Sequence, residues 1–160
     1  MDKAQSLPRL IDVKLDEKTL VRRSPEVEHE RAIAIYDLLE DNYFEPVGCG
    51  EGPYKLYLSL QENRLIFDVR DADGAEFGKI PVPLTPFRRI VKEYFEICQT
   101  YYDAIKTAPA SRIEAIDMGR RGLHNDGSEL LRERLEGKIE LDHNTSRRLF
   151  TLLCVLHIRK

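Results

Sequence analysis

Long hydrophobic runs are absent from this sequence. The longest unbroken apolar stretch, residues 152–156, is far shorter than the roughly 20 residues that a membrane-spanning helix needs. The first residues also lack the pattern of a secretory signal, which is a basic segment followed by an apolar one. We therefore expect a cytoplasmic protein with no membrane partner.

Cysteine is scarce as well, because the chain has only Cys49, Cys98 and Cys154. An odd number of widely spaced cysteines argues against a disulfide framework and against a zinc site. Cys98 and Cys154 fall on apolar helical patterns, so we expect both to be small core residues. Cys49 lies in a glycine-rich segment, which makes it the candidate for an exposed and reactive thiol.

Motifs for metal and phosphate binding are also missing. His29, His143 and His157 are scattered, and no pair has the spacing of metal ligands. The glycine-rich segment 46–53 resembles a phosphate loop only in composition. A phosphate loop leads from a strand into a helix, whereas this segment is expected to lead from a helix into a strand. We predict no metal and no cofactor.

The balance of charge argues against nucleic acid as the main partner. The net charge is −3, whereas nucleic-acid binding needs a basic face that displaces counterions. Residues 1–80 hold 17 acidic and 11 basic side chains, and residues 81–160 hold 11 and 14. Arginine outnumbers lysine by 16 to 9, and arginine binds carboxylates and phosphates in a bidentate manner. The partner indicated is an anionic small molecule or an acidic protein surface.

The composition, 42% hydrophobic and 33% charged, is typical of a folded protein. Repeats, low-complexity segments and linkers are absent, so we expect a single domain over residues 1–160, with a loose end at 1–7. Strand patterns occur at 10–17 and, as a three-stranded antiparallel meander, at 54–82. Pro81 and Pro83 interrupt the third strand of this meander, which predicts a position at the edge of the sheet.

Two helices are well marked. The first runs from Ser24 and Pro25 to about Glu40, where Asn42 is a plausible C-cap. The second is a long amphipathic helix over 85–106, capped by Thr85 and begun by Pro86. The residues expected to face the core are, in the first helix, Ala32, Ile33, Ile35, Tyr36, Leu38 and Leu39, and in the second, Phe87, Ile90, Val91, Tyr94, Phe95, Cys98, Tyr101, Tyr102 and Ile105.

The C-terminal half predicts shorter elements. Two capping boxes, Ser111 with Glu114 and Asp126 with Glu129, indicate a helix ending at Gly119 and another over 128–136, separated by the loop 120–127. A short strand at 138–141 and a last helix from 144 or 145 to 157 follow, although the apolar run 149–156 also fits an interior strand. The predicted class is α+β: an antiparallel meander sheet of about three to four strands, packed by a long amphipathic helix and three to four further helices.

Four adjacent arginine pairs stand out, at 22–23, 88–89, 120–121 and 147–148. Two of them fall in the predicted first turn of a helix, where the dipole disfavours cations by roughly 0.3–1 kcal/mol. If the helix starts converge, the pairs would combine guanidinium and backbone N–H groups into an anion site. Alternatively, each pair forms surface salt bridges worth about 0–1 kcal/mol. The candidate ligand-binding residues are Arg88, Arg89, Arg120, Arg121, His124, Asn125, Arg147 and Arg148.

The segment 120–127, RRGLHNDG, is the densest polar cluster in the chain. His124 is a possible acid, base or switch near neutral pH, oriented by Asn125 or Asp126. The sequence identifies no nucleophile beside it, and Asp126 is equally explained as a helix cap. We assign no catalytic residue and keep His124 as a candidate.

The chain resembles the uncharacterised bacterial protein family 0262. The likeness spans about residues 10–157 and is carried by the runs RRSPEVEHERAIAIYDLLE, YLSLQENRLIFDVRD, LTPFRRIVKEYF, IEAIDMGRRGLHNDGSELLRERL and RRLFTLLCVLH. The resemblance implies one small bacterial domain. It implies no activity and offers no catalytic residues to transfer.

Three functions fit these patterns, and the sequence leaves the oligomeric state undecided. The preferred one is a noncatalytic binding module that holds an anionic metabolite or an acidic protein partner through paired arginines. The second is a small enzyme acting on a phosphorylated substrate, which requires His124 to lie in a concave pocket within reach of an arginine pair. The third is an oligomeric structural or interaction protein whose aromatic helix pairs with a copy of itself.

Overall fold

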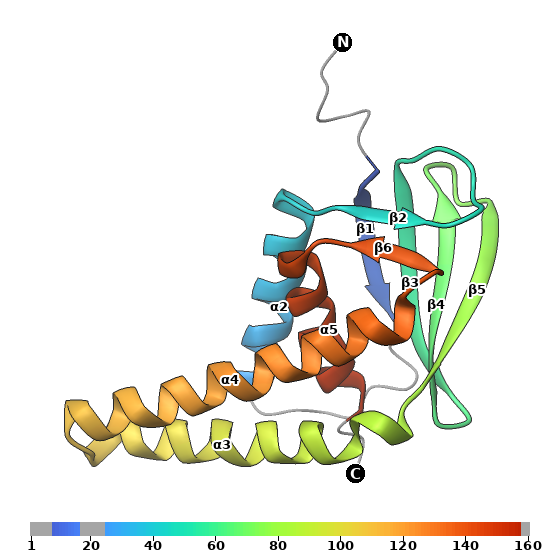
Figure 1. Ribbon diagram of the computed structural model, residues 1–160. Helices are drawn as coiled ribbons and strands as arrows, with labels where there is room; N and C mark the ends of the chain where they lie inside the picture. The colour runs from blue at the N-terminus through green and yellow to red at the C-terminus, as the bar shows by residue number, and fades with distance from the viewer. Residues whose placement is uncertain (1–7, 17–24, 158–160) are drawn as a thin grey trace.

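The computed structural model describes residues 8–16 and 25–157, and it has the predicted α+β class. The elements follow one another along the chain as shown in Figure 1: β1 (Leu10–Leu15), α2 (Pro25–Glu40), β2 (Phe44–Pro46), β3 (Tyr54–Gln61), β4 (Arg64–Asp71), β5 (Glu76–Pro83), the 3-10 turn η2 (Thr85–Phe87), α3 (Arg88–Thr107), α4 (Ala110–Leu135), β6 (Ile139–Leu141) and α5 (His143–His157). No helix in the described ranges is both long and apolar enough to span a membrane.

The main sheet has four strands in the order β1-β3-β4-β5. Its strands β3, β4 and β5 form the predicted antiparallel meander. β5 lies at the edge of the sheet, as predicted, and prolines are tolerated there because no further strand needs their missing N–H groups. β1 pairs in parallel with the opposite side of β3. A second sheet pairs β2 with β6, and the sequence analysis did not predict β2.

Helix α5 is the centre of the core. Figure 1 shows it enclosed by the main sheet, α2 and α4. Its apolar side chains point to all of these neighbours. Burying one large apolar side chain stabilises the fold by roughly 1.5–3 kcal/mol, because its surface is removed from water. The buried residues are Leu149, Phe150, Leu152, Leu153, Cys154, Val155 and Leu156. The alternative of an interior strand is therefore wrong.

Helices α3 and α4 form an antiparallel hairpin that projects from the body of the molecule (Figure 1). Phe87, the last residue of η2, and Val91, in the first turn of α3, join the core, whereas Ile105 near the hairpin tip is 50% exposed. The core face of α2 also differs from the prediction, because Ala34 is buried. The helix is turned so that some predicted core residues face outward: Ala32, Ile33 and Tyr36.

The predicted break in α4 is wrong. Residues 110–135 form one continuous helix, so neither the stop at Gly119 nor the loop 120–127 exists. The Asp126 capping box is consequently absent, and the helix begins at Ala110 after Pro109 without a side-chain cap. Packing against α3 and α5 overrides the weak helix propensity of the glycines and of Asn125.

Two other helix starts are also shifted. Thr85 begins η2 rather than capping α3, and its hydroxyl accepts a hydrogen bond from Asn63. Helix α5 begins at His143, where the carboxylate of Asp142 accepts the hydrogen bond of the Thr145 amide. Arg147 and Arg148 thus lie in the second turn of α5, beyond the strongest effect of its dipole.

The close contact between α4 and α5 explains why residue 127 is a glycine. A Cβ atom added there would lie 2.1 Å from the Phe150 ring, whereas one added at Gly122 on the same helix would meet nothing within 4 Å. The buried hydroxyl of Ser146 donates to the carbonyl of Ser128 at 2.7 Å and fixes the same crossing of α4 and α5.

We therefore expect Gly127→Ala to lower the free energy of unfolding by about 1–3 kcal/mol, as overpacking does. Gly122→Ala is the matched control and should raise it by about 0.5–1 kcal/mol through helix propensity. Urea denaturation of both variants checks this expectation. Equal effects at the two positions would contradict the packing account.

Candidate functional site: a pocket between three helices

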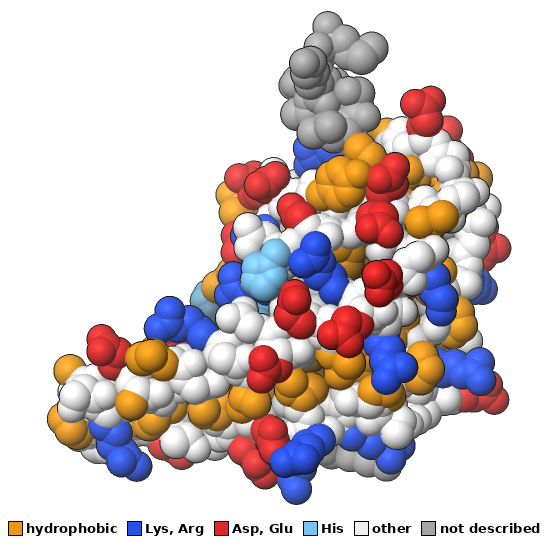
Figure 2. Space-filling view, viewed as in Figure 1, with side chains coloured by type: hydrophobic (Ala, Val, Ile, Leu, Met, Phe, Trp, Pro, Cys, Tyr) orange, Lys and Arg blue, Asp and Glu red, His pale blue; other side chains and the backbone are white. Residues whose placement is uncertain are grey.

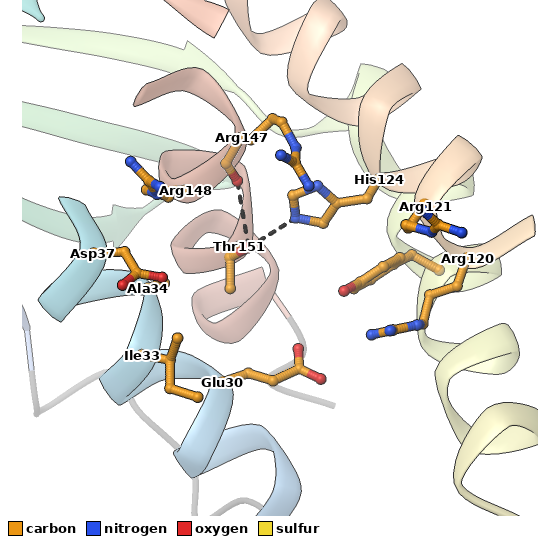
Figure 3. A pocket seen from close by; sticks show the side chains of 11 residues that line it. Glu30, Ile33, Ala34, Asp37, Arg120, Arg121, His124, Arg147, Arg148 and Thr151 are labelled. Carbon is orange, nitrogen blue, oxygen red and sulfur yellow. Dashed lines mark hydrogen bonds between the residues drawn. The ribbon is translucent and has the colours of Figure 1, made fainter. Parts of the chain in front are cut away.

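A pocket of about 350 Å³ lies between α2, α4 and α5, with Tyr94 of α3 in its wall (Figure 3). On each of the three helices the lining residues recur at steps of one, three or four, which places them on one face. They are Glu30, Ile33, Ala34 and Asp37 of α2, Arg120, Arg121 and His124 of α4, and Arg147, Arg148 and Thr151 of α5.

Two of the four arginine pairs meet in this pocket, at 120–121 and 147–148. The pair at 88–89 does not line it, since Arg88 donates to Asn63 and Arg89 pairs with Glu93 on the surface. The pair at 22–23 lies outside the described residues. Asn125 and Asp126 are exposed on α4 and do not line the pocket.

The arginines of α4 are anchored by one carboxylate. Asp117 accepts a hydrogen bond from Arg120 at 2.6 Å and forms a salt bridge with Arg121 at 3.2 Å. The guanidinium of Arg120 also lies 4.5 Å from the centre of the Tyr101 ring, a cation–π distance. These contacts fix Arg120 and partly neutralise both charges, as the salt-bridge alternative anticipated.

The arginines of α5 have no such carboxylate partner within residues 8–16 and 25–157. Arg148 donates to the backbone carbonyl of Asp41 at 3.2 Å, which connects α5 to the end of α2. Arg147 forms no salt bridge with any residue in the described part of the chain, and its buried Nε has no hydrogen-bond partner there. No direct contact with a described residue therefore compensates the charge of Arg147.

His124 is hydrogen-bonded to α5. Its Nε2 lies 2.8 Å from the hydroxyl oxygen of Thr151, which is also 3.3 Å from the backbone carbonyl of Arg147. The other ring nitrogen, Nδ1, is buried and has no hydrogen-bond partner among the described residues. The ring packs against Tyr94 and Phe150, with centroids 5.3 and 5.2 Å away.

Burial, followed by the positive charges of Arg147 and Arg120, lowers the pKa of His124 to about 4. The imidazole is therefore neutral at neutral pH. The positive charge of the pocket therefore comes from its arginines and not from His124.

The acidic residues of the pocket all belong to α2. Glu30 accepts a hydrogen bond from the Tyr102 hydroxyl, and burial, followed by this contact, raises the pKa of Tyr102. Asp37 forms no salt bridge with any described cation. Figure 3 shows both carboxylates on the α2 side of the gap.

The contributions of α2 and Thr151 to the pocket were not predicted. Glu30, Ala34 and Asp37 recur at helical spacing, but no local pattern indicates that they face the arginines of other helices. Recognising residues 120–124 as helical would have placed Arg120, Arg121 and His124 on one face.

The candidate thiol, Cys49, finds little support as a reactive group. Cys49 is half-buried in the glycine-rich segment, and burial raises its pKa, which disfavours the thiolate. Cys98 and Cys154 are buried core residues, as predicted. No group of three or more His, Cys, Asp or Glu within residues 8–16 and 25–157 is arranged to hold a metal ion.

The lowered pKa of His124 makes stability depend on pH. The unfolded chain, with a pKa near 6.5, takes up the proton first, so stability falls as pH decreases from about 6.5 towards 4. Between about pH 7.5 and 5 we expect the wild type to lose roughly 2 kcal/mol more than His124→Gln, which keeps an amide donor for Thr151. Urea unfolding at both pH values measures this difference. The exposed His29→Gln control should behave as the wild type, and parallel pH profiles for all three proteins would refute the assignment.

Comparison with known proteins identifies the family. The model of an uncharacterised protein family, UPF0262, matches residues 7–159. The chain is 62% identical over 151 residues to a UPF0262 protein of Paramagnetospirillum magneticum, covering 94% of this chain and 96% of the relative. It is 59% identical over 157 residues to one of Rhizobium meliloti, covering 98% and 99%. No solved structure matches. The chain therefore belongs to UPF0262, the family that its sequence resembles.

Proposed function

We propose that the pocket between α2, α4 and α5 binds a small anionic metabolite without transforming it. The observation that carries this proposal is the convergence of Arg147 and Arg148 with Arg120 and Arg121 on one small cavity. The anion would carry a phosphate or carboxylate group, because guanidinium forks match the geometry of both.

The imbalance of charge in the pocket favours an anion at α5. Asp117 already compensates Arg120 and Arg121, whereas Arg147 lacks any carboxylate partner among the described residues. A partly buried cation interacts more strongly with an anion than an exposed one, because water screens the pair less.

The enzymatic alternative has one feature in its favour, since His124 lies in a concave pocket beside the arginine pairs. Its two ring nitrogens argue for a structural role. Nε2 is engaged by Thr151, and Nδ1 is buried, so neither is presented to a substrate proton in this arrangement. We therefore favour binding over acid–base catalysis.

An acidic protein surface is the less favoured partner. Figure 2 shows Lys and Arg side chains interspersed with Asp and Glu on the face in view, rather than gathered in one broad basic area. Arg147 and Arg148, which have no carboxylate partner in the described part of the chain, line a cavity of about 350 Å³ instead. This volume is near the lower end of the range for small-molecule sites.

The test is a titration of the protein with phosphate and carboxylate compounds by calorimetry at low ionic strength. Arg147→Gln should weaken the binding of the highest-affinity anion by about tenfold or more, because a hydrogen bond to a charged group contributes roughly 1.5–3 kcal/mol. Arg121→Gln should weaken it less, since Asp117 already shares that charge.

Arg89→Gln is the matched control, because it removes the same charge from an exposed residue outside the pocket. It should leave the affinity within about twofold, as expected for a screened surface charge. Equal weakening by Arg89→Gln and Arg147→Gln, or no binding by any anion, would reject the pocket as an anion site.

A further inference from the structure

We infer that the ligand of this pocket carries a protonated amino group in addition to its anionic group. The ligand class is therefore a small amine-bearing phosphate or carboxylate. This inference rests on the proposed function and is drawn from the two charged walls of the same cavity.

The first observation is that opposite charges line the pocket without pairing across it. Glu30 and Asp37 belong to α2, and the arginines belong to α4 and α5. No salt bridge within the described part of the chain joins either acid to a pocket arginine. Figure 3 shows the gap between the walls. A ligand with both charges would contact both walls at once.

The second observation is that the acids are not needed to neutralise the α4 arginines. Asp117 already accepts from Arg120 and pairs with Arg121 from outside the pocket lining. A pocket selecting a simple anion would gain affinity if Glu30 and Asp37 were neutral, because each repels an anion. Their presence favours a ligand that also has a cationic group.

The third observation concerns hydrogen-bonding capacity. Glu30 uses one carboxylate oxygen for the Tyr102 hydroxyl, which orients it and leaves further acceptor sites. Asp37 has no salt bridge to any residue that the structure describes. An ammonium group has three donors and no acceptor, so it matches a wall of carboxylates.

Size restricts the ligand further. A cavity of about 350 Å³ is near the small end of ligand sites, which fits a compact metabolite rather than a dinucleotide. Ile33 and Ala34, which lie between the two acids on α2, would contact a short aliphatic linker between the charged groups.

The experiment compares two matched pairs of compounds by calorimetry with the intact protein. Each pair differs only in the amino group: O-phosphoethanolamine against monoethyl phosphate, and β-alanine against propionate. We expect the amine-bearing member of at least one pair to bind about tenfold or more tightly, since it adds charge-assisted hydrogen bonds.

Variants then locate the preference. Asp37→Asn and Glu30→Gln should each reduce the ratio between the paired compounds several-fold while leaving the amine-free anion bound equally or more tightly. Glu40→Gln is the control, because it removes the same charge from an exposed position on α2 outside the pocket. It should leave the ratio unchanged.

The outcomes separate the two proposals. If the amine-free anions bind as tightly as their partners and still depend on Arg147, the anion site stands and the amino-group inference is overturned. If none of the four compounds binds, the amino-group inference is overturned, and the anion site is rejected with it when no other phosphate or carboxylate compound binds. A preference for the amine that Asp37→Asn and Glu30→Gln do not reduce would also reject the assignment to α2.

Discussion

The burial of helix α5 is the constraint on which this structure depends. From Leu149 to Leu156 nearly every side chain is apolar, so no single neighbour can cover the helix. The sheet, α2 and α4 each cover part of it (Figure 1). Gly127 and Ser128 permit α4 to approach closely, because a Cβ at Gly127 would overlap the Phe150 ring. The arrangement of the helices follows from this enclosure.

The pocket lies where that enclosure is incomplete. Arg147, Arg148 and Thr151 form the polar stripe of an otherwise apolar helix, and charged side chains resist burial without partners. α2 and α4 therefore leave a gap along the stripe instead of closing over it. Their own polar residues line the same gap, so one packing constraint brings the cations of α4 and α5 opposite the acids of α2.

Several elements were predictable because their signals are local. Alternating apolar residues identify β3 and β4, and the prolines of β5 identify an edge strand, as the structure confirms. The break in α4 was predicted wrongly for the same reason: Gly119, Gly122 and Asn125 are local signals for a helix end. Contacts with α3 and α5 stabilise the continuous helix by more than these residues cost.

The sequence by itself determined the α+β class, the family, the buried cysteines and the paired arginines. The family follows from the likeness of long sequence runs to known relatives. The other three follow from composition and short-range periodicity, which depend on neighbouring residues alone. Only the tertiary structure decided which pairs meet, since Arg120 and Arg147 come together through the crossing of α4 and α5 whereas Arg88 remains on the surface. It also decided that Glu30 and Asp37 face them, because the orientation of α2 depends on which of its faces the core buries.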